Sequence, residues 1–275
     1  INERTLKPFA GLVSNVTINK LHEQLKPLKI QAEETNLKFL KYYALISFDG
    51  DNMGEWFSGE NLEDSGDLLG FHKMLSQQLH QFANEASAYL NKYGKTVFAG
   101  EDFLGFINLL FLFEAVADMQ RLWQTIVNDE LGSKFKFKND KQMTFSAGIV
   151  IAHYKQPLGL VLKQVREAAT EAKKGEKNSF TLVAMNHSGN KLTCTYSFNS
   201  DAIESLSKIK TELESNFSSA FISKYNQVLA HLGNEIPEAL VAKELKTNIS
   251  RACKAEKQPG ESDEKFGNRK RDLIN

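Results

Sequence analysis

The chain has 275 residues, of which 41% are hydrophobic and 25% are charged, and its 34 Lys and Arg residues balance its 34 Asp and Glu residues. This composition is typical of a globular protein and excludes a disordered, fibrous or collagen-like chain. Because the formal net charge is zero, the composition also argues against a protein that holds nucleic acid by bulk electrostatics alone.

Residues 1–40 are predicted to form a connector, because their polarity is mixed and prolines interrupt them. The chain begins at Ile1 without a basic stretch followed by an apolar one, so we expect no secretion signal. The missing initial Met indicates processing or a fragment of a longer chain. No run of about 18 apolar residues occurs, which predicts no membrane span and favours a cytoplasmic protein.

The clearest strand is predicted over residues 41–48, which are rich in aromatic and apolar side chains and contain no breaker. It ends at the acidic tripeptide 49–51. A helix start over 52–57 follows. Next comes a long amphipathic helix, whose apolar residues recur with i, i+3, i+4 spacing from Leu68 to Leu90.

Two short strands, 95–99 and 103–109, form a predicted hairpin whose tip is the tripeptide 100–102. Helices and strands then alternate, with a helix over 114–131, a strand over 143–152, a helix over 158–174, a strand over 180–185 and an edge strand or hairpin arm over 191–198. This order predicts an α+β sandwich with its helices on one face of the sheet.

The pattern changes beyond residue 200, where helical segments over 202–220, 221–232 and 237–254 follow one another without a strand. We therefore divide the chain into an α+β domain and a helical domain, and expect a charged tail that is mobile or bound to a partner. The predicted boundaries are 41–199 for the α+β domain, 200–257 for the helical domain and 258–275 for the tail. Cys194 and Cys253 lack C-x-x-C spacing and are expected to be reduced thiols.

The first candidate site is Asp49-Gly50-Asp51, at the end of the predicted buried strand. Carboxylates there are costly to desolvate unless a cation neutralises them, as a divalent ion does. Gly50 would let a main-chain carbonyl or a phosphate approach. The alternative is a simple Asp-Gly turn in which Asp51 caps the following helix.

The second candidate site is the hairpin tip, Gly100-Glu101-Asp102. Glycine and acidic residues occur at such tips for turn geometry alone. In a sheet of this order, however, the first strand lies beside the hairpin, so the two acidic clusters would face each other. Four converging carboxylates repel unless they bind metal, which predicts a Mg²⁺ or Mn²⁺ site that holds a nucleoside triphosphate and activates a hydroxyl group.

Four segments of the sequence, in order, resemble the Cas-ten family, the large subunit of type III CRISPR effector complexes, and are most similar to its Cmr-type branch. The segment 42–54 resembles the first palm strand, and 97–104 resembles the G-G-D-D hairpin, which is related to the GGDEF hairpin of diguanylate cyclases. The segment 145–154 resembles the next core strand, and 172–178 resembles the A-K-x-x-G-R-N segment.

The resemblance implies a ferredoxin-like palm of the nucleotidyl-cyclase type followed by an α-helical domain, within a portion or a reduced version of that subunit. It implies conversion of ATP into cyclic oligoadenylate, with other subunits of the complex, guide RNA and target RNA as partners and no membrane. Carried over by position, the catalytic metal ligands would be Asp49, Asp51, Glu101 and Asp102, and the nucleotide would lie against Gly50, Gly100 and Lys173. Lys173 could equally be a solvated charge at the end of a helix.

The hairpin departs from the family pattern, since Ala99, Gly100, Glu101 and Asp102 stand where the family has two glycines and two aspartates. Glu keeps the charge but is longer by one methylene, and Ala is costly only if its position needs positive φ. The resemblance also implies two facing palms, of which this chain supplies one. A catalytically silent scaffold that contacts neighbouring subunits and guide RNA is therefore an alternative. A homodimeric cyclic-dinucleotide synthase of the diguanylate type is another.

Overall fold

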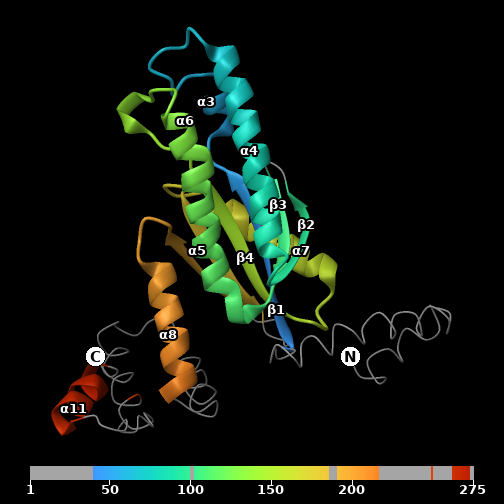
Figure 1. The fold of residues 1–275 in the computed structure, drawn as a ribbon. Coiled ribbons are helices and arrows are strands. Elements are labelled where there is room, and N and C mark those ends of the chain that lie inside the picture. The colour runs from blue at the N-terminus through green and yellow to red at the C-terminus, as the bar shows by residue number, and fades with distance from the viewer. Residues whose placement is uncertain (1–39, 100–101, 186–190, 217–248, 250–261, 273–275) are drawn as a thin grey trace, which may run out of the picture.

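The computed structural model describes residues 40–99, 102–185, 191–216, 249 and 262–272. A six-stranded mixed sheet with helices on both faces forms its centre (Figure 1). The strands are β1 (Tyr42–Gly50), β2 (Gly94–Ala99), β3 (Asp102–Ile107), β4 (Phe145–His153), β5 (Ser179–Met185) and β6 (Lys191–Ser197). The α-helices are α3 (Met53–Phe57), α4 (Leu68–Leu90), α5 (Leu112–Trp123), α6 (Glu130–Gly132), α7 (Leu158–Ala172), α8 (Ala202–Asn216) and α11 (Asp263–Asp272), with short 3₁₀ or π turns η2 (Leu109–Phe111), η3 (Gln124–Asp129) and η4 (Lys138–Asp140).

The strand order is β2-β3-β1-β4-β5-β6. β1 is antiparallel to β3 and to β4, whereas β4 and β5 are parallel. The run β1-α4-β2-β3-α5-β4 therefore has the βαββαβ connectivity of a ferredoxin-like palm, and β5 and β6 extend the sheet beyond β4. The expected position of the first strand beside the hairpin is confirmed.

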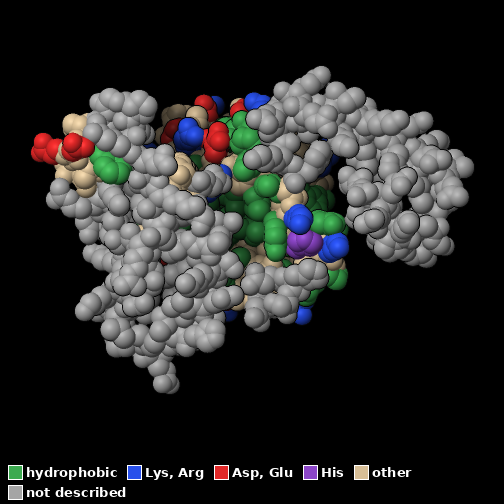
Figure 2. Space-filling model, turned by 90° about the horizontal axis from the view of Figure 1, so that it is seen from below, with side chains coloured by type: hydrophobic (Ala, Val, Ile, Leu, Met, Phe, Trp, Pro, Cys, Tyr) green, Lys and Arg blue, Asp and Glu red, His purple; other side chains and the backbone are tan. Residues whose placement is uncertain are grey.

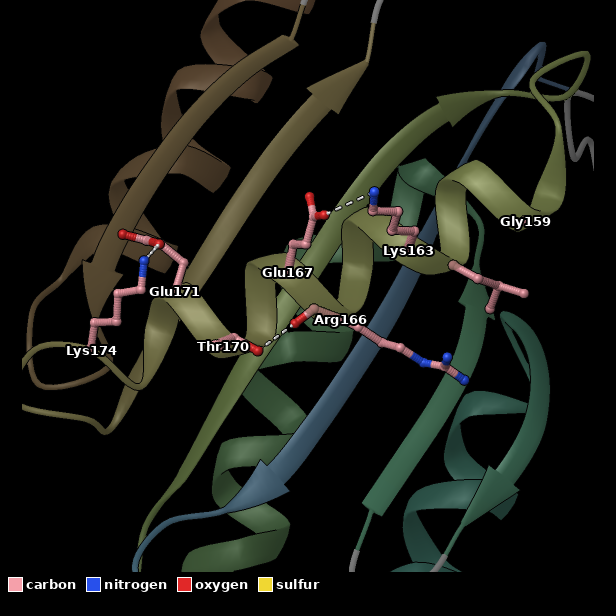
Figure 3. A pocket seen from close by; sticks show the side chains of 8 residues that line it. Gly159, Lys163, Arg166, Glu167, Thr170, Glu171 and Lys174 are labelled. Carbon is pink, nitrogen blue, oxygen red and sulfur yellow. Dashed lines mark hydrogen bonds and ion pairs between the residues drawn. The ribbon is translucent and has the colours of Figure 1, made fainter.

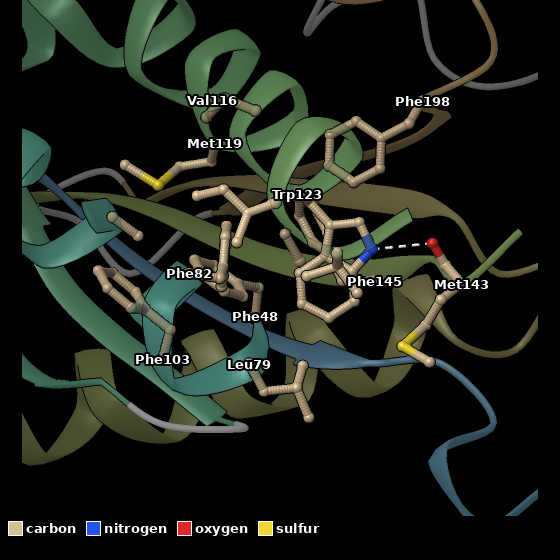
Figure 4. Close-up of a cluster of buried hydrophobic side chains, with 14 of the residues drawn as sticks. Phe48, Leu79, Phe82, Phe103, Val116, Met119, Trp123, Met143, Phe145 and Phe198 are labelled. Atoms are coloured by element: carbon tan, nitrogen blue, oxygen red, sulfur yellow. Dashed lines mark hydrogen bonds between the residues drawn. The ribbon is translucent and has the colours of Figure 1, made fainter. Parts of the chain in front are cut away.

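One face of the sheet is covered by α4 and α5 over an aromatic core (Figure 4). The rings of Phe48 and Phe103 stack in register with their centroids 4.5 Å apart. Trp123, at the end of α5, donates its indole N–H to the Met143 carbonyl at 2.8 Å. The long helix α4 forms because its apolar residues recur on one side, and Asp67 caps its start by accepting the Gly70 N–H at 3.0 Å.

The opposite face is covered by α7, so the prediction that all helices lie on one face is wrong. The strands are apolar on both sides, and Leu45 and Val150 face α7 in a second, smaller core. Parallel strands β4 and β5 also require a crossover connection, which α7 supplies. At Gly148, a Cβ would lie 2.3 Å from the Val165 carbonyl oxygen, so glycine lets the backbone of α7 approach β4 closely.

Part of the predicted domain organisation lies outside the described residues. The first helix beyond residue 200 is observed as α8, while the rest of the predicted helical domain up to 257, apart from residue 249, is not described, and neither are connector residues 1–39. Within the predicted tail, α11 forms. Of the helices that the structure describes, none combines the length and apolarity needed to cross a membrane.

Exposed hydrophobic side chains lie at the end of the sheet where β1 starts. The end at which β1 starts is seen in Figure 2, where hydrophobic side chains lie beside Lys or Arg and His side chains. Tyr42, Tyr154 and Leu158 are among the exposed large hydrophobic residues of this end. The acidic tripeptide predicted to carry chemistry lies at the other end, where β1 stops.

Candidate functional site

Two carboxylates lie opposite each other in the sheet. Asp49 of β1 is in register with Asp102, the first residue of β3. Directly opposed residues of an antiparallel pair share one face, with their Cβ atoms about 4.5–5.5 Å apart. Because the preceding pair, Phe48 and Phe103, points into the aromatic core, alternation places the two aspartates on the α7 face. The structure thus brings Asp49 and Asp102 together from distant parts of the sequence.

A lysine that directly follows α7 pairs with one of these two carboxylates. Lys173, the first residue after α7, makes an ion pair with Asp49 and lies 3.3 Å from the Gly50 carbonyl oxygen. The next residue, Lys174, bonds to Glu171 at 2.6 Å instead. Like charges directly opposed on a sheet destabilise it, so the Lys173 ammonium group offsets the repulsion. A cation is therefore held by one carboxylate and one main-chain oxygen.

A second lysine reaches the same end of the sheet. Lys177 donates a hydrogen bond to the Asn52 side-chain oxygen. Lys177 and Asn178 both have left-handed backbones, with φ of 59° and 45°, as does Asn52 with 53°. Sequence reasoning gave no role to Lys177 or Asn52, although the four-residue spacing of Lys173 and Lys177 within the segment 172–178 was a usable signal.

Asp51 has a different environment from Asp49. It is 2% exposed, and its carboxylate accepts hydrogen bonds from the Ser146 hydroxyl at 2.8 Å, the Thr144 hydroxyl at 2.8 Å and the Asn178 main-chain N–H at 2.9 Å. Its own N–H donates to the Thr144 carbonyl at 2.8 Å. Sequence reasoning missed Thr144 and Ser146, because nothing local links them to an aspartate more than ninety residues away.

The predicted glycines and the hairpin tip are only partly described. A Cβ on Gly50 would lie 2.6 Å from the Met53 sulfur, so this glycine makes room for Met53 and turns its carbonyl to Lys173. Gly100 and Glu101 lie outside the described residues. Ala99 of β2 pairs with Phe103 of β3 and has no positive φ. The alanine that replaces a family glycine therefore costs no backbone strain.

The donor set fits a hard divalent cation that is bound jointly with a substrate. Within the described part of the chain, no three Asp, Glu, His or Cys side chains converge to form a complete metal cage. The carboxylates of Asp49 and Asp102 and the Gly50 carbonyl are all oxygen ligands. Mg²⁺ is usually held by one or two carboxylates together with substrate phosphates and water. These oxygen ligands therefore fit a hard divalent cation such as Mg²⁺ or Mn²⁺.

The helix after the acidic tripeptide carries a perturbed carboxyl group. The pKa of Glu55 in α3 lies below its ordinary value of 4.5, and the largest cause is the hydrogen bond that Lys141 donates to it at 2.9 Å. Loss of hydration opposes this shift, while the charges of Lys141 and Lys177 reinforce it. The positive charge of Lys177 therefore acts on α3 as well as on the loop that carries it.

A surface pocket lies outside this site. A shallow surface pocket of about 730 Å³ runs along the exposed side of α7, lined by Gly159, Leu162, Lys163, Arg166, Glu167, Thr170, Glu171 and Lys174 (Figure 3). Several of its charges are paired within the helix, as Lys163 is with Glu167 at 3.8 Å. It includes neither carboxylate of the register pair, so we do not assign the chemistry to it.

Comparisons with known proteins agree with this architecture. Residues 42–181 match the family model described as Cas10/Cmr2, second palm domain. The chain is similar to a chain in the cryo-EM structure of the Type III-B Cmr-beta bound to cognate target RNA, with a TM-score of 0.52, 14% identity and coverage of 85% of this chain and 37% of that one. No curated protein matches the sequence.

Two further solved structures are more distant. A chain of the Csm1–Csm4 cassette in complex with one ATP has a TM-score of 0.39 and 16% identity, covering 57% of this chain and 23% of that one. The diguanylate cyclase SiaD from Pseudomonas aeruginosa, in complex with its activator SiaC, has a TM-score of 0.37 and 15% identity, covering 63% of this chain and 72% of that one. The chain thus spans little more than a third of the Cmr-beta chain that it matches.

Proposed function

Because the chain belongs to the Cas10/Cmr2 family, whose second palm domain it matches over residues 42–181, we propose that it is the nucleotidyltransferase palm of a type III CRISPR RNA-guided effector complex. The proposed reaction converts ATP into cyclic oligoadenylate. The 3′-hydroxyl of one nucleotide attacks the α-phosphorus of the next, a new phosphodiester bond forms, and pyrophosphate leaves. Other subunits of the complex, guide RNA and target RNA are the proposed partners.

The observation that carries this proposal is the in-register pair of Asp49 and Asp102, with the Gly50 carbonyl beside it. We assign divalent-cation binding to these groups and to Glu101 of the hairpin tip. Bound Mg²⁺ or Mn²⁺ would supply charge neutralisation at the phosphates and polarise the phosphoryl oxygens.

The lysines of the segment 173–178 are suited to bind the triphosphate. Lys173 already contacts Asp49, and Lys177 is held by Asn52 on the same side. When a nucleotide and its cation enter, the carboxylate no longer needs the Lys173 ammonium group, which is then available for a phosphate oxygen. The protein would thus exchange an internal ion pair for contacts to substrate, without leaving either charge unpaired.

The test is ATP turnover in the assembled complex with target RNA bound. We expect Asp49→Asn and Asp102→Asn each to lower cyclic oligoadenylate formation by about 100-fold or more, since each removes a charged ligand at the reacting phosphate. Asp64→Asn is the matched control, because Asp64 is exposed and bonds only to the nearby Gly66 N–H at 2.8 Å among the contacts recorded for it. Unchanged product from the Asp49 and Asp102 variants would exclude the assignment.

A silent scaffold is the second candidate function. It is favoured by the fact that Asp49 is already neutralised by Lys173 and that Asp51 accepts three hydrogen bonds, so these two carboxylates are stabilised without metal. Calorimetry separates the two candidates. Mn²⁺-dependent binding of ATP by the 275-residue chain supports the enzyme, and the absence of heat at millimolar ATP supports the scaffold.

A further inference from the structure

We infer that Asp51 is a positioning residue, which fixes the lysine segment 173–178 next to the carboxylate pair rather than binding the cation itself. This inference rests on the proposed function, since it concerns how the same site holds a triphosphate. It starts from the contrast between two aspartates that stand two residues apart: Asp49 is 43% exposed in its side chain, and Asp51 is 2% exposed.

The carboxylate of Asp51 has little capacity left for an ion. An ionised carboxylate offers about four lone-pair positions, and hydrogen bonds occupy three of the four on Asp51. All three donors are neutral, two hydroxyl groups and one main-chain amide. These donors replace the hydration that the carboxylate loses on burial. The same donors would have to be released before a hydrated cation could take their place.

The three bonds connect three separate segments of the chain. Asp51 follows the last residue of β1, Thr144 and Ser146 lie at the start of β4, and Asn178 ends the segment that leads from α7 to β5. The Asn178 carbonyl also accepts the Phe198 N–H at 2.8 Å. The far end of the lysine segment is therefore fixed on one side by Asp51 and on the other by the residue after β6.

The backbone of the lysine segment requires such support. Lys177 and Asn178 both have φ in the left-handed region, which non-glycine residues disfavour. The hydrogen bond from the Asn178 N–H to Asp51 holds the second of these residues at 2.9 Å. Since Lys177 directly precedes Asn178, this bond helps to position Lys177, together with the bond from the Ser179 hydroxyl to the Lys177 carbonyl at 2.7 Å. Loss of the bond should release the lysine without touching the cation ligands.

The experiment changes the donors and leaves Asp51 itself in place. Thr144→Val removes one hydroxyl donor at nearly constant volume, and Thr144→Ser restores it. Thr211→Val is the control, because Thr211 is exposed and its hydroxyl bonds only within helix α8 among the contacts recorded for it. The Thr144 hydroxyl and the Asn178 N–H donate to the same carboxylate oxygen of Asp51, so loss of the hydroxyl leaves that oxygen less firmly oriented towards Asn178. In the ligand-free 275-residue chain, we therefore expect hydrogen–deuterium exchange of the segment 173–178 to rise in Thr144→Val and to stay at the wild-type level in the other two variants.

Calorimetry with ATP and Mn²⁺ supplies the second measurement. We expect Thr144→Val to weaken ATP binding about five- to tenfold and Thr144→Ser to recover it. In a Lys177→Met background, Thr144→Val should have no further effect, because it acts through that lysine. Binding of Mn²⁺ alone, followed by electron paramagnetic resonance, should not change in Thr144→Val.

Each contrary result has a distinct meaning. Unchanged exchange in Thr144→Val overturns the positioning role, whatever the nucleotide data show. Equal weakening of Mn²⁺ alone and of ATP overturns it in favour of direct cation binding by Asp51, and full additivity with Lys177→Met overturns it too. If exchange rises while Asp49→Asn leaves ATP binding unchanged, the proposed function fails and the structural role of Asp51 stands.

Discussion

The two faces of the central sheet differ in what their side chains do. On the face covered by α4 and α5, β1 contributes Phe48, which stacks on Phe103 of β3 within an aromatic core. On the α7 face, the very next register pair is Asp49 and Asp102. Successive residues of the same two strands are thus buried aromatic rings on one face and charged carboxylates on the other. Because side chains alternate between the faces of a strand, one strand can supply core residues and candidate site residues at adjacent positions.

The α7 face itself changes along its length. Its middle is aliphatic, with Leu45 and Val150 packed against Val165. Towards the end of β1, the side chains of this face become polar and partly exposed, ending at Asp49. Charged groups keep much of their hydration there, so they avoid the large penalty of full burial. If the two faces are separate in this way, substitutions on the aromatic face should lower the free energy of unfolding, and substitutions on the α7 face should weaken ATP binding.

The largest expected effect is on stability, from truncation of the aromatic face. Phe103→Ala should lower the free energy of unfolding by about 3–5 kcal/mol, because it removes a fully buried ring and leaves a cavity. Denaturant unfolding followed by circular dichroism measures this. Phe98→Ala is the control, since Phe98 of β2 is 48% exposed and should change stability by less than about 1 kcal/mol. A similar small loss from Phe103→Ala would contradict the role of this core.

The next effect should appear in binding and leave stability nearly unchanged. Asp49→Asn with Asp102→Asn should weaken Mn²⁺-dependent ATP binding about 100-fold, equivalent to about 2.7 kcal/mol. The free energy of unfolding should change by less than about 1 kcal/mol, because the substitution removes a repulsion between opposed charges together with an exposed ion pair. Calorimetry and denaturant unfolding of the same preparation test both halves. A large loss of stability would mean that the two faces are not separable.

A smaller effect is expected from the lysine that links α7 to β1. Lys173→Met should weaken ATP binding about tenfold, since it removes one charged phosphate contact. Lys163→Met is the matched control, because Lys163 is an exposed lysine of α7, the helix that Lys173 follows, and it pairs with Glu167. Affinities from calorimetry decide the matter. Equal effects of the two substitutions would reduce the role of Lys173 to a general contribution to surface charge.

Much of this architecture could be predicted from the sequence, for identifiable reasons. The strand 41–48 and the long helix that begins near residue 68 carry strong periodic patterns with clear stops, and both are observed. The pair of Asp49 and Asp102 followed from an acidic strand end and an acidic hairpin tip, once the strand order was assumed. These features are local, and a single sequence records them directly.

The remainder depends on contacts that local patterns do not record. The position of α7 on the opposite face could not be derived, because periodicity shows that a helix has an apolar side but not which sheet face it covers. The partners of Asp51 could not be foreseen either, since Thr144 and Asn178 are 93 and 127 residues away. Predicting such bonds requires the register of three segments at once.

The smallest expected effect concerns Glu55, which reports on the charge of the lysine segment. Its pKa lies below 4.5, with the hydrogen bond from Lys141 as the largest cause and the Lys177 charge as a lesser one. Because the folded-state pKa is lowered, the contribution of Glu55 to stability is present above about pH 4.5 and is lost as the pH falls through the lower folded value.

An NMR titration of the Glu55 carboxyl carbon should show that Lys141→Met raises the pKa of Glu55 more than Lys177→Met does. ATP binding should raise it as well, because triphosphate bound at Lys177 brings negative charge towards Glu55. A Glu55 pKa that does not change with ATP would place the triphosphate away from Lys177, and the polar end of the α7 face would then be limited to Asp49, Asp102 and Lys173.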